Sequence, residues 1–165
     1  MSKFTKYFFP PLTVVTVTVA LAGPGWARES AVNVSLWDKG ADAAMATGLG
    51  MGMAGAKMSD ATMGIKLSAN AVAAGKVTFE VTNNSKDIIH EMVIALVQSG
   101  NDRLPFAAAE DKVDEERISD LGEVSELDPG KSGSLTLDLK PGKYVLLCNV
   151  PGHYMNGMWA LLTVK

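Results

Sequence analysis

Alternation of apolar and polar residues is the dominant pattern in the chain after residue 30. Residues 77–82 (VTFEVT) and 134–139 (SLTLDL) carry an apolar side chain at every second position. This period is typical of strands that bury one face. Further strands are expected at 32–36, 65–67, 88–97, 143–148 and 158–164, several of them separated by Gly, Pro, Asn or Asp clusters. Six or seven short strands with little helix predict an all-β fold, a Greek-key antiparallel β-sandwich.

Three segments do not follow the strand pattern. Residues 41–64 are rich in Gly, Ala and Met without a clean period, and we expect a long loop with at most a helical turn. Residues 106–113 (FAAAEDKV) predict one short helix. Residues 110–128 hold nine acidic and two basic residues, a net charge of -7. A solvated excursion explains this charge, and a docking patch for a basic partner is the alternative.

The N-terminal segment has the composition of a secretory signal peptide. Lys3 and Lys6 precede an apolar run of about 15 residues, and small residues follow it. We expect residues 1–27 to be removed by cleavage after Ala27, with cleavage after Ala22 as the alternative. A membrane anchor is disfavoured because a span needs roughly 20 apolar residues. Residues 28–165 then form a single periplasmic domain that is not held in the membrane.

Composition narrows the classes of function. An apolar content of 47% supports a folded core, and a net charge of -3 argues against nucleic-acid binding. The chain has one cysteine, which cannot form an internal disulfide after export. Cys148 therefore needs either deep burial or a chemical role.

The segment CNVPGHYMNGM (148–158) brings that cysteine close to a histidine and a methionine. Cys148, His153 and Met158 are each separated by four residues, and Pro-Gly predicts a turn between them. A thiolate, imidazoles and a weak thioether form the ligand set of electron-transfer copper sites, which need a second histidine. The one other histidine is His90, at an inward position of the strand expected at 88–97. Taken singly, each residue is explained by core packing or loop structure, and zinc is the competing metal.

These residues resemble a known family. YVLLCNVPGHYMNGMWALLTV (144–164) is similar to the C-terminal metal loop of cupredoxins, the type 1 blue copper proteins, with the spacing of auracyanin- and rusticyanin-type members. VTFEVTNNSKDIIHEMVI (77–94) resembles the strand and turn that carry the first histidine ligand. The resemblance covers about residues 65–165 and implies that His90, Cys148 and His153 are equatorial copper ligands, with Met158 axial. Many members have Asn after the first histidine to link the two ligand loops, whereas this chain has Glu91.

The resemblance implies a one-electron carrier rather than an enzyme. The edge of His153 is the expected electron port, with Pro151, Met155 and Trp159 as an apolar rim for a redox partner protein. A multicopper oxidase or nitrite reductase needs more histidines than the two present. A purely structural sandwich, with an inert Cys148, is the remaining alternative.

The methionine-rich stretch suggests a second function. The five methionines between residues 45 and 63 offer soft thioethers to Cu(I) and predict a second, weaker site, or else pack the loop on the sandwich. These residues are Met45, Met51, Met53, Met58 and Met63. Together with SLWDKG (35–40) and ATMGIKL (61–67), the stretch resembles periplasmic cupredoxins that are linked to copper tolerance. The resemblance implies an alternative function, a protein that buffers copper and exchanges it with a copper-handling partner.

Overall fold

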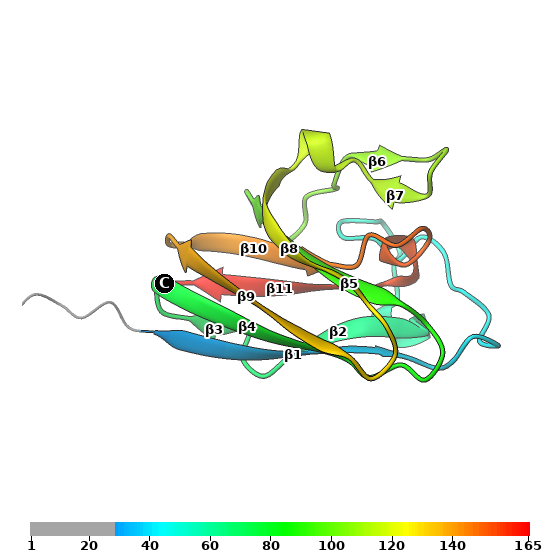
Figure 1. Cartoon of the computed structure of the whole chain (residues 1–165). Coiled ribbons are helices and arrows are strands. Elements are labelled where there is room, and N and C mark those ends of the chain that lie inside the picture. The colour runs from blue at the N-terminus through cyan, green and yellow to red at the C-terminus, as the bar shows by residue number, and fades with distance from the viewer. Residues whose placement is uncertain (1–28) are drawn as a thin grey trace, which may run out of the picture.

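The structure, a computed structural model, describes residues 29–165. Two β-sheets pack face to face, and a small hairpin lies outside them (Figure 1). The predicted β-sandwich is therefore confirmed. The signal peptide expected at residues 1–27, with its two cleavage sites, lies outside the described residues.

The first sheet is built largely from the segments with clear alternation. Its strand order is β2-β1-β4-β9. The bounds are β1 Ser30–Asp38, β2 Met63–Leu67, β4 Gly75–Asn83 and β9 Ser132–Leu139. Along β4, Val77, Phe79 and Val81 are buried while the residues between them are more exposed, as a sheet with one solvated face requires.

The second sheet holds the metal-site strands, and its central strands are buried on both faces. Its order is β3-β11-β10-β5-β8. The bounds are β3 Ala71–Val72, β5 His90–Val97, β8 Ser119–Leu127, β10 Gly142–Leu147 and β11 Trp159–Val164. One face of β5 and β10 packs on the first sheet, and the other is covered by Met51, Val113 and Tyr154. Double burial explains why β5 is apolar almost throughout.

Two strand pairs depart from the predicted antiparallel arrangement. β1 runs parallel to β4, and β3 runs parallel to β11, whereas the other pairs are antiparallel. Parallel neighbours need a crossover instead of a tight hairpin. Residues 39–62 and then β2 separate β1 from β4, so the methionine-rich segment forms part of that connection.

The prediction of a short helix at 106–113 is wrong. The segment forms a hairpin of β6 (Phe106–Ala107) and β7 (Lys112–Val113), and Asp111 has φ 53°, which a right-handed helix excludes. Packing overrides the helix propensity of the alanines because the Phe106 ring lies 6.3 Å from that of Tyr154. The helices among residues 29–165 are single 3-10 turns: η1 Met58–Asp60, η2 Glu115–Arg117 and η3 Tyr154–Asn156. None of these helices has the length and apolar character needed to cross a membrane.

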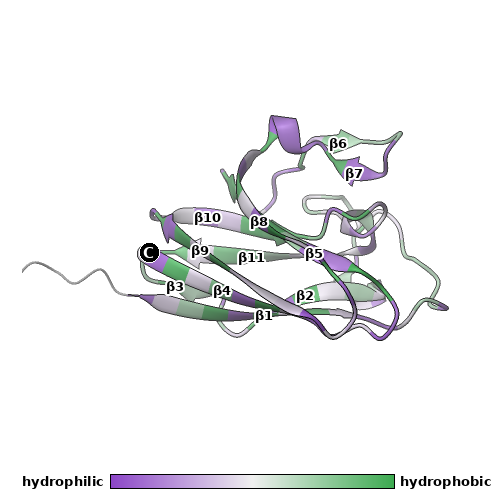
Figure 2. Cartoon of the chain, viewed as in Figure 1, coloured by the Kyte–Doolittle hydropathy of each residue, from purple (hydrophilic) through white to green (hydrophobic). Residues whose placement is uncertain are grey.

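The acidic segment contains a strand as well as solvated turns. β8 lies at the edge of the second sheet, and most of its side chains are exposed. Figure 2 shows hydrophilic residues at η2 and β7, next to this edge. Charged side chains on an edge strand discourage pairing with another chain, so the acids of β8 fit its position in the sheet.

The core between the sheets leads directly to the metal site. Phe79, Leu146 and Leu162 are fully buried there, each stabilising the fold by about 1.5–3 kcal/mol. His90, Cys148 and Met158 are buried at 0% exposure, and the last two belong to the same apolar cluster. The site thus lies at one end of the sandwich core.

Candidate metal centre

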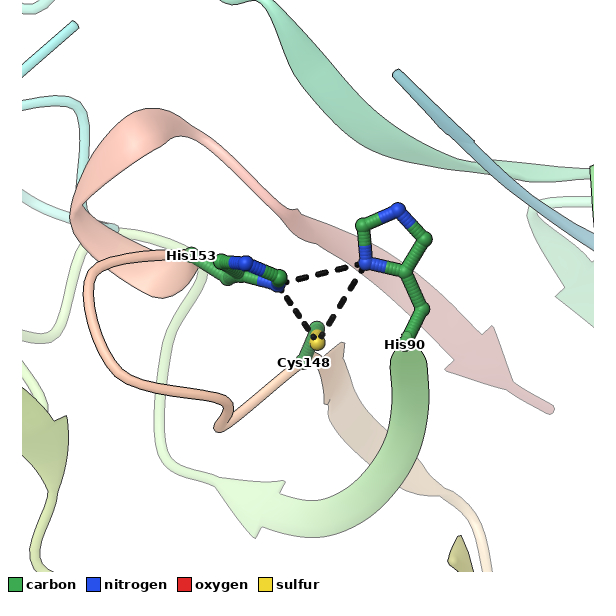
Figure 3. Close-up of side chains that lie close together, drawn as sticks. All are labelled: His90, Cys148 and His153. Atoms are coloured by element: carbon green, nitrogen blue, oxygen red, sulfur yellow. Dashed lines mark hydrogen bonds between the residues drawn. The ribbon is translucent and has the colours of Figure 1, made fainter. Parts of the chain in front are cut away.

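Three side chains from separate segments converge at this end of the sandwich. His90 is the first residue of β5, Cys148 directly follows β10, and His153 precedes η3 (Figure 3). His153 Nδ1 lies 3.2 Å from His90 Nδ1 and 3.3 Å from Cys148 Sγ. The Sγ atom is 4.0 Å from His90 Nδ1, and all three residues are buried. One ion can contact all three donor atoms.

Met158 is joined to the ligand loop by backbone hydrogen bonds. The amide of Cys148 donates to the Met158 carbonyl at 3.0 Å, and the Met158 amide donates to the His153 carbonyl at 3.1 Å. The Met158 side chain is fully buried in the same apolar cluster as Cys148. The structure therefore brings all four predicted site residues to one end of the core.

The Pro-Gly turn predicted in the loop is present. Gly152 has φ +81° and donates its amide to the Asp111 carbonyl at 2.8 Å. A side chain at residue 152 would also meet Met45, since a Cβ there lies 2.9 Å from Met45 Cε. Glycine is thus required by its backbone conformation and by its contacts.

Glu91 links the two ligand segments in place of the expected asparagine. Its carboxylate Oε1 accepts the amide of Asn149 at 3.0 Å, and its own amide donates to Cys148 Sγ at 3.5 Å. Burial raises the pKa of Glu91. Glu91 thus replaces the amide of the asparagine found in many family members with a carboxyl group, and it still connects the two ligand segments.

Asn149 is a functional residue that the sequence did not reveal. Its side chain accepts the Val113 amide at 2.7 Å and donates to the Val113 carbonyl at 2.9 Å. A further hydrogen bond joins it to Glu115. The β6–β7 hairpin is thereby fixed to the residue after Cys148.

Asp38 is a second residue that sequence reasoning missed. At the end of β1, its Oδ2 lies 2.9 Å from His90 Nε2, and its side chain is 2% exposed. Burial raises the pKa of Asp38, but hydrogen bonds from Ser85 and His90 outweigh this effect, so its pKa is lowered. A sequence separation of 52 residues gave no local signal for this contact.

The titration of the donors is set by burial. Burial lowers the pKa of His90, although Asp38 opposes the change, and burial together with His90 lowers the pKa of His153 to about 4. Both rings are therefore neutral near pH 7 and offer lone pairs. Burial raises the pKa of Cys148 to about 12 in the metal-free protein. A metal must displace the thiol proton, so its affinity increases with pH.

The methionine-rich segment is fixed onto the metal loop. Asn156 Oδ1 accepts the Ala46 amide at 3.0 Å and the Thr62 hydroxyl at 3.2 Å. The Leu49 amide donates to the Met155 carbonyl at 2.8 Å, and Trp159 Nε1 donates to the Leu49 carbonyl at 2.7 Å. The two segments lie side by side at the end of the molecule away from the C-terminus (Figure 1).

The five methionines of the segment do not surround a single point. Met51 and Met63 are buried in different apolar clusters, whereas Met45 and Met58 are 49% and 42% exposed. Met51 and Met53 line a cavity of about 210 Å³ with Met155. Met45, Met58 and Met63 are not among the residues that line this cavity.

The predicted apolar rim around His153 is only partly open. Pro151 is exposed and Met155 is half-buried, but Trp159 is half-buried and bonded to Leu49. Met45 instead lies against Gly152, beside His153. His153 itself is 6% exposed.

Comparison with known proteins agrees with this geometry. A family model for copper binding proteins of the plastocyanin/azurin family matches residues 51–165. Among solved structures, reduced auracyanin from the photosynthetic bacterium Roseiflexus castenholzii is 21% identical with a TM-score of 0.50, covering 85% of this chain and 99% of that chain. Rusticyanin from Thiobacillus ferrooxidans is 16% identical with a TM-score of 0.54, covering 85% and 79%. No curated protein sequence matches the chain.

The donor set fits the metal of the matched family. Two neutral imidazoles, a thiol and a buried thioether are the donors that an electron-transfer copper site needs. Zinc is disfavoured because closed zinc sites use four strong ligands, and a thioether is weak. Copper, as one type 1 ion, is the cofactor that fits.

Proposed function

Because the chain belongs to the plastocyanin/azurin family of copper-binding proteins, we propose that it is a periplasmic type 1 copper protein that carries one electron at a time. The observation that carries the proposal is the convergence of His90 Nδ1, Cys148 Sγ and His153 Nδ1 in a buried cluster. His90, Cys148, His153 and Met158 would hold the copper ion. Bound copper supplies one-electron chemistry by alternating between Cu(I) and Cu(II).

The protein contributes a site that is fixed before the metal binds. Glu91 and Asn149 join the two ligand segments, and the hydrogen bonds of Met158 close the loop on itself. Because these groups are buried and bonded, we expect the donors to keep their positions in both oxidation states. Little reorganisation is then needed when an electron moves.

We propose that the protein is a carrier and not an enzyme. A multicopper catalytic centre needs several more histidines, and both histidines of the chain are already committed to this site. The proposed electron port is the outer edge of His153, with a redox partner docking on Pro151, Met155 and Met45.

The ligand assignment is tested by visible absorption after Cu(II) is added to the mature protein. We expect an intense thiolate-to-copper band that Cys148→Ser abolishes and Met158→Leu retains. Met58→Leu is the matched control: this exposed thioether lies against Gly157 of the metal loop but is not a proposed ligand, so the spectrum should stay unchanged. A band that survives Cys148→Ser would refute the assignment.

Export to the periplasm is supported by the composition of residues 1–27. The mass of the protein recovered from a bacterial periplasmic fraction tests it. We expect a chain beginning at Arg28, or at Gly23 if cleavage follows Ala22. A full-length chain in the membrane fraction would favour the anchor instead.

A second candidate function is copper buffering in tolerance, together with a copper-handling partner. It is favoured by the cavity that Met51, Met53 and Met155 line, because three thioethers suit Cu(I). Titration with Cu(I) under anaerobic conditions tests it. Buffering predicts a second equivalent that Met53→Leu with Met155→Leu removes and Met58→Leu does not. If the wild type and all variants bind one Cu(I) per chain, copper buffering by this cavity is refuted and the carrier function remains.

A further inference from the structure

A buried carboxylate lies directly behind one of the proposed copper ligands. Asp38 Oδ2 is 2.9 Å from His90 Nε2, the ring nitrogen that faces away from Cys148 and His153. The His90 side chain is fully buried and that of Asp38 is 2% exposed. Water therefore competes little for this contact.

The carboxylate is held in its orientation from two sides. Its other oxygen, Oδ1, accepts the Gly40 amide at 2.6 Å. Asp38 also pairs with Met63 at the end of β1, and the Lys39 amide donates to the Thr62 carbonyl at 2.8 Å. The Gly40 amide and the end of the methionine-rich segment thus fix the position of Asp38.

The contact determines which nitrogen of His90 carries the proton. An ionised carboxylate only accepts hydrogen bonds, so Nε2 must be the N–H of the neutral ring. The lone pair of Nδ1 is then directed toward Cys148 and His153, where a metal ligand is required. A carboxylate on the far nitrogen also makes the ligating nitrogen a stronger donor.

We propose that Asp38 is a positioning residue that fixes the metal-binding tautomer of His90 and biases the site toward Cu(II). The inference rests on the proposed function, because it concerns the same site. Greater donor strength and a nearby negative charge both stabilise the ion of higher charge. Asp38 therefore lowers the reduction potential of the protein.

Asp38 lies outside the part of the chain that the family model matches. The match begins at residue 51, whereas the carboxylate comes from β1. The carboxylate that contacts His90 thus comes from a segment that the family model does not include.

The alternative is that Asp38 only joins β1 to β5, and Asp38→Asn separates the two roles. Its amide keeps the size of the side chain but has one acceptor oxygen, whereas the carboxylate accepts from the Gly40 amide, the Ser85 hydroxyl and His90 Nε2. With that oxygen on Gly40, the amide NH₂ faces Nε2 and favours the Nδ1–H tautomer. Asp138→Asn is the charge control, since this exposed acid lies opposite Lys76 in the β4–β9 register, at the end of β4 remote from the site.

The first measurement needs no metal. Long-range ¹H–¹⁵N NMR on the copper-free protein reports the tautomer of each histidine ring. We expect Nε2–H at His90 in the wild type and in Asp38→Glu, and loss of that preference in Asp38→Asn. An Nδ1–H wild-type ring, or the same tautomer in Asp38→Asn, overturns the positioning role. An Nδ1–H ring in the wild type alone would overturn the positioning role, even if the variants fail to fold.

The second measurement is the reduction potential of the copper-loaded protein. Loss of an outer partner changes metal affinity by about 10–100-fold. We expect the ratio of Cu(II) to Cu(I) affinity to fall at least tenfold in Asp38→Asn, and a tenfold fall raises the potential by about 59 mV. Asp138→Asn leaves it unchanged. An unchanged reduction potential in Asp38→Asn overturns the bias toward Cu(II). Failure of the wild type to bind copper is a different outcome: it refutes the proposed function but does not affect the tautomer result.

Discussion

The two histidines of the site lie in different surroundings, although each brings an Nδ1 atom to the same point. His90 is fully buried, and its Nε2 is bound to Asp38. His153 Nε2 has no hydrogen-bond partner among residues 29–165. Every buried side-chain nitrogen or oxygen in this part of the chain has a partner, so His153 Nε2 is not buried and reaches solvent. One ligand is thus fixed from inside the fold, and the other offers a short path from the metal to the surface.

Removing each ring should test this difference most strongly. We expect His90→Gly and His153→Gly each to weaken copper binding by more than about 100-fold, because even an outer partner is worth about 10–100-fold. Added imidazole should restore the visible band of His153→Gly, since the hole opens to solvent. It should not restore His90→Gly, whose hole is closed by the core and Asp38.

Absorption titrations with imidazole measure this effect, and urea unfolding shows whether each variant is folded. Equal rescue of the two variants would contradict the difference in access. Rescue of His90→Gly alone would reverse it.

The same contrast explains how much of the site was predictable. Cys148, His153 and Met158 occupy one short loop, so their spacing and the Pro-Gly turn carried the information. His90 followed from the resemblance and from being the one other histidine. Asp38 and Asn149 act through contacts that join distant segments, and no local pattern marks an aspartate at a strand end or an asparagine after a cysteine.

The fold shows a similar division between local and distant causes. The strands with one solvated face, such as β4 and β9, were predicted because alternation is a local property. The edge strand β8 was missed because its exposed, acidic residues have no apolar alternation. The local sequence at 106–113 predicts a helix, whereas the observed hairpin contacts Tyr154 and Asn149, far along the chain.

The pH dependence of the copper-free protein should sharpen the comparison. Burial and His90 lower the pKa of His153 from 6.5 to about 4, so the unfolded chain binds more protons between these values. The unfolding free energy should therefore fall as pH decreases from about 6.5 to about 4. His90 should contribute less to this fall, because Asp38 opposes the lowering of its pKa.

Urea unfolding of the metal-free protein between pH 4 and pH 7.5 measures this effect. His153→Gln should flatten the profile more than His90→Gln, because the pKa of His153 is lowered further than that of His90. A profile that is unchanged by His153→Gln, or that is flattened more by His90→Gln, would contradict the stated order of the two rings.

The smallest expected effect concerns the surface next to His153. If the outer edge of this ring is the electron port, a polar side chain on its rim should hinder apolar docking without changing the copper site. Met45→Gln, Met155→Gln and Pro151→Glu should each slow electron self-exchange about fivefold, the equivalent of about 1 kcal/mol. The reduction potential should stay constant because none of these three is a proposed ligand. Leu96→Gln is the matched control, since Leu96 is 45% exposed at the other end of β5 from His90.

NMR line broadening in mixtures of reduced and oxidised protein gives the rates of self-exchange. Unchanged rates in all three rim variants, or equal slowing in Leu96→Gln, would place the port away from His153 and remove the functional contrast between the two histidines.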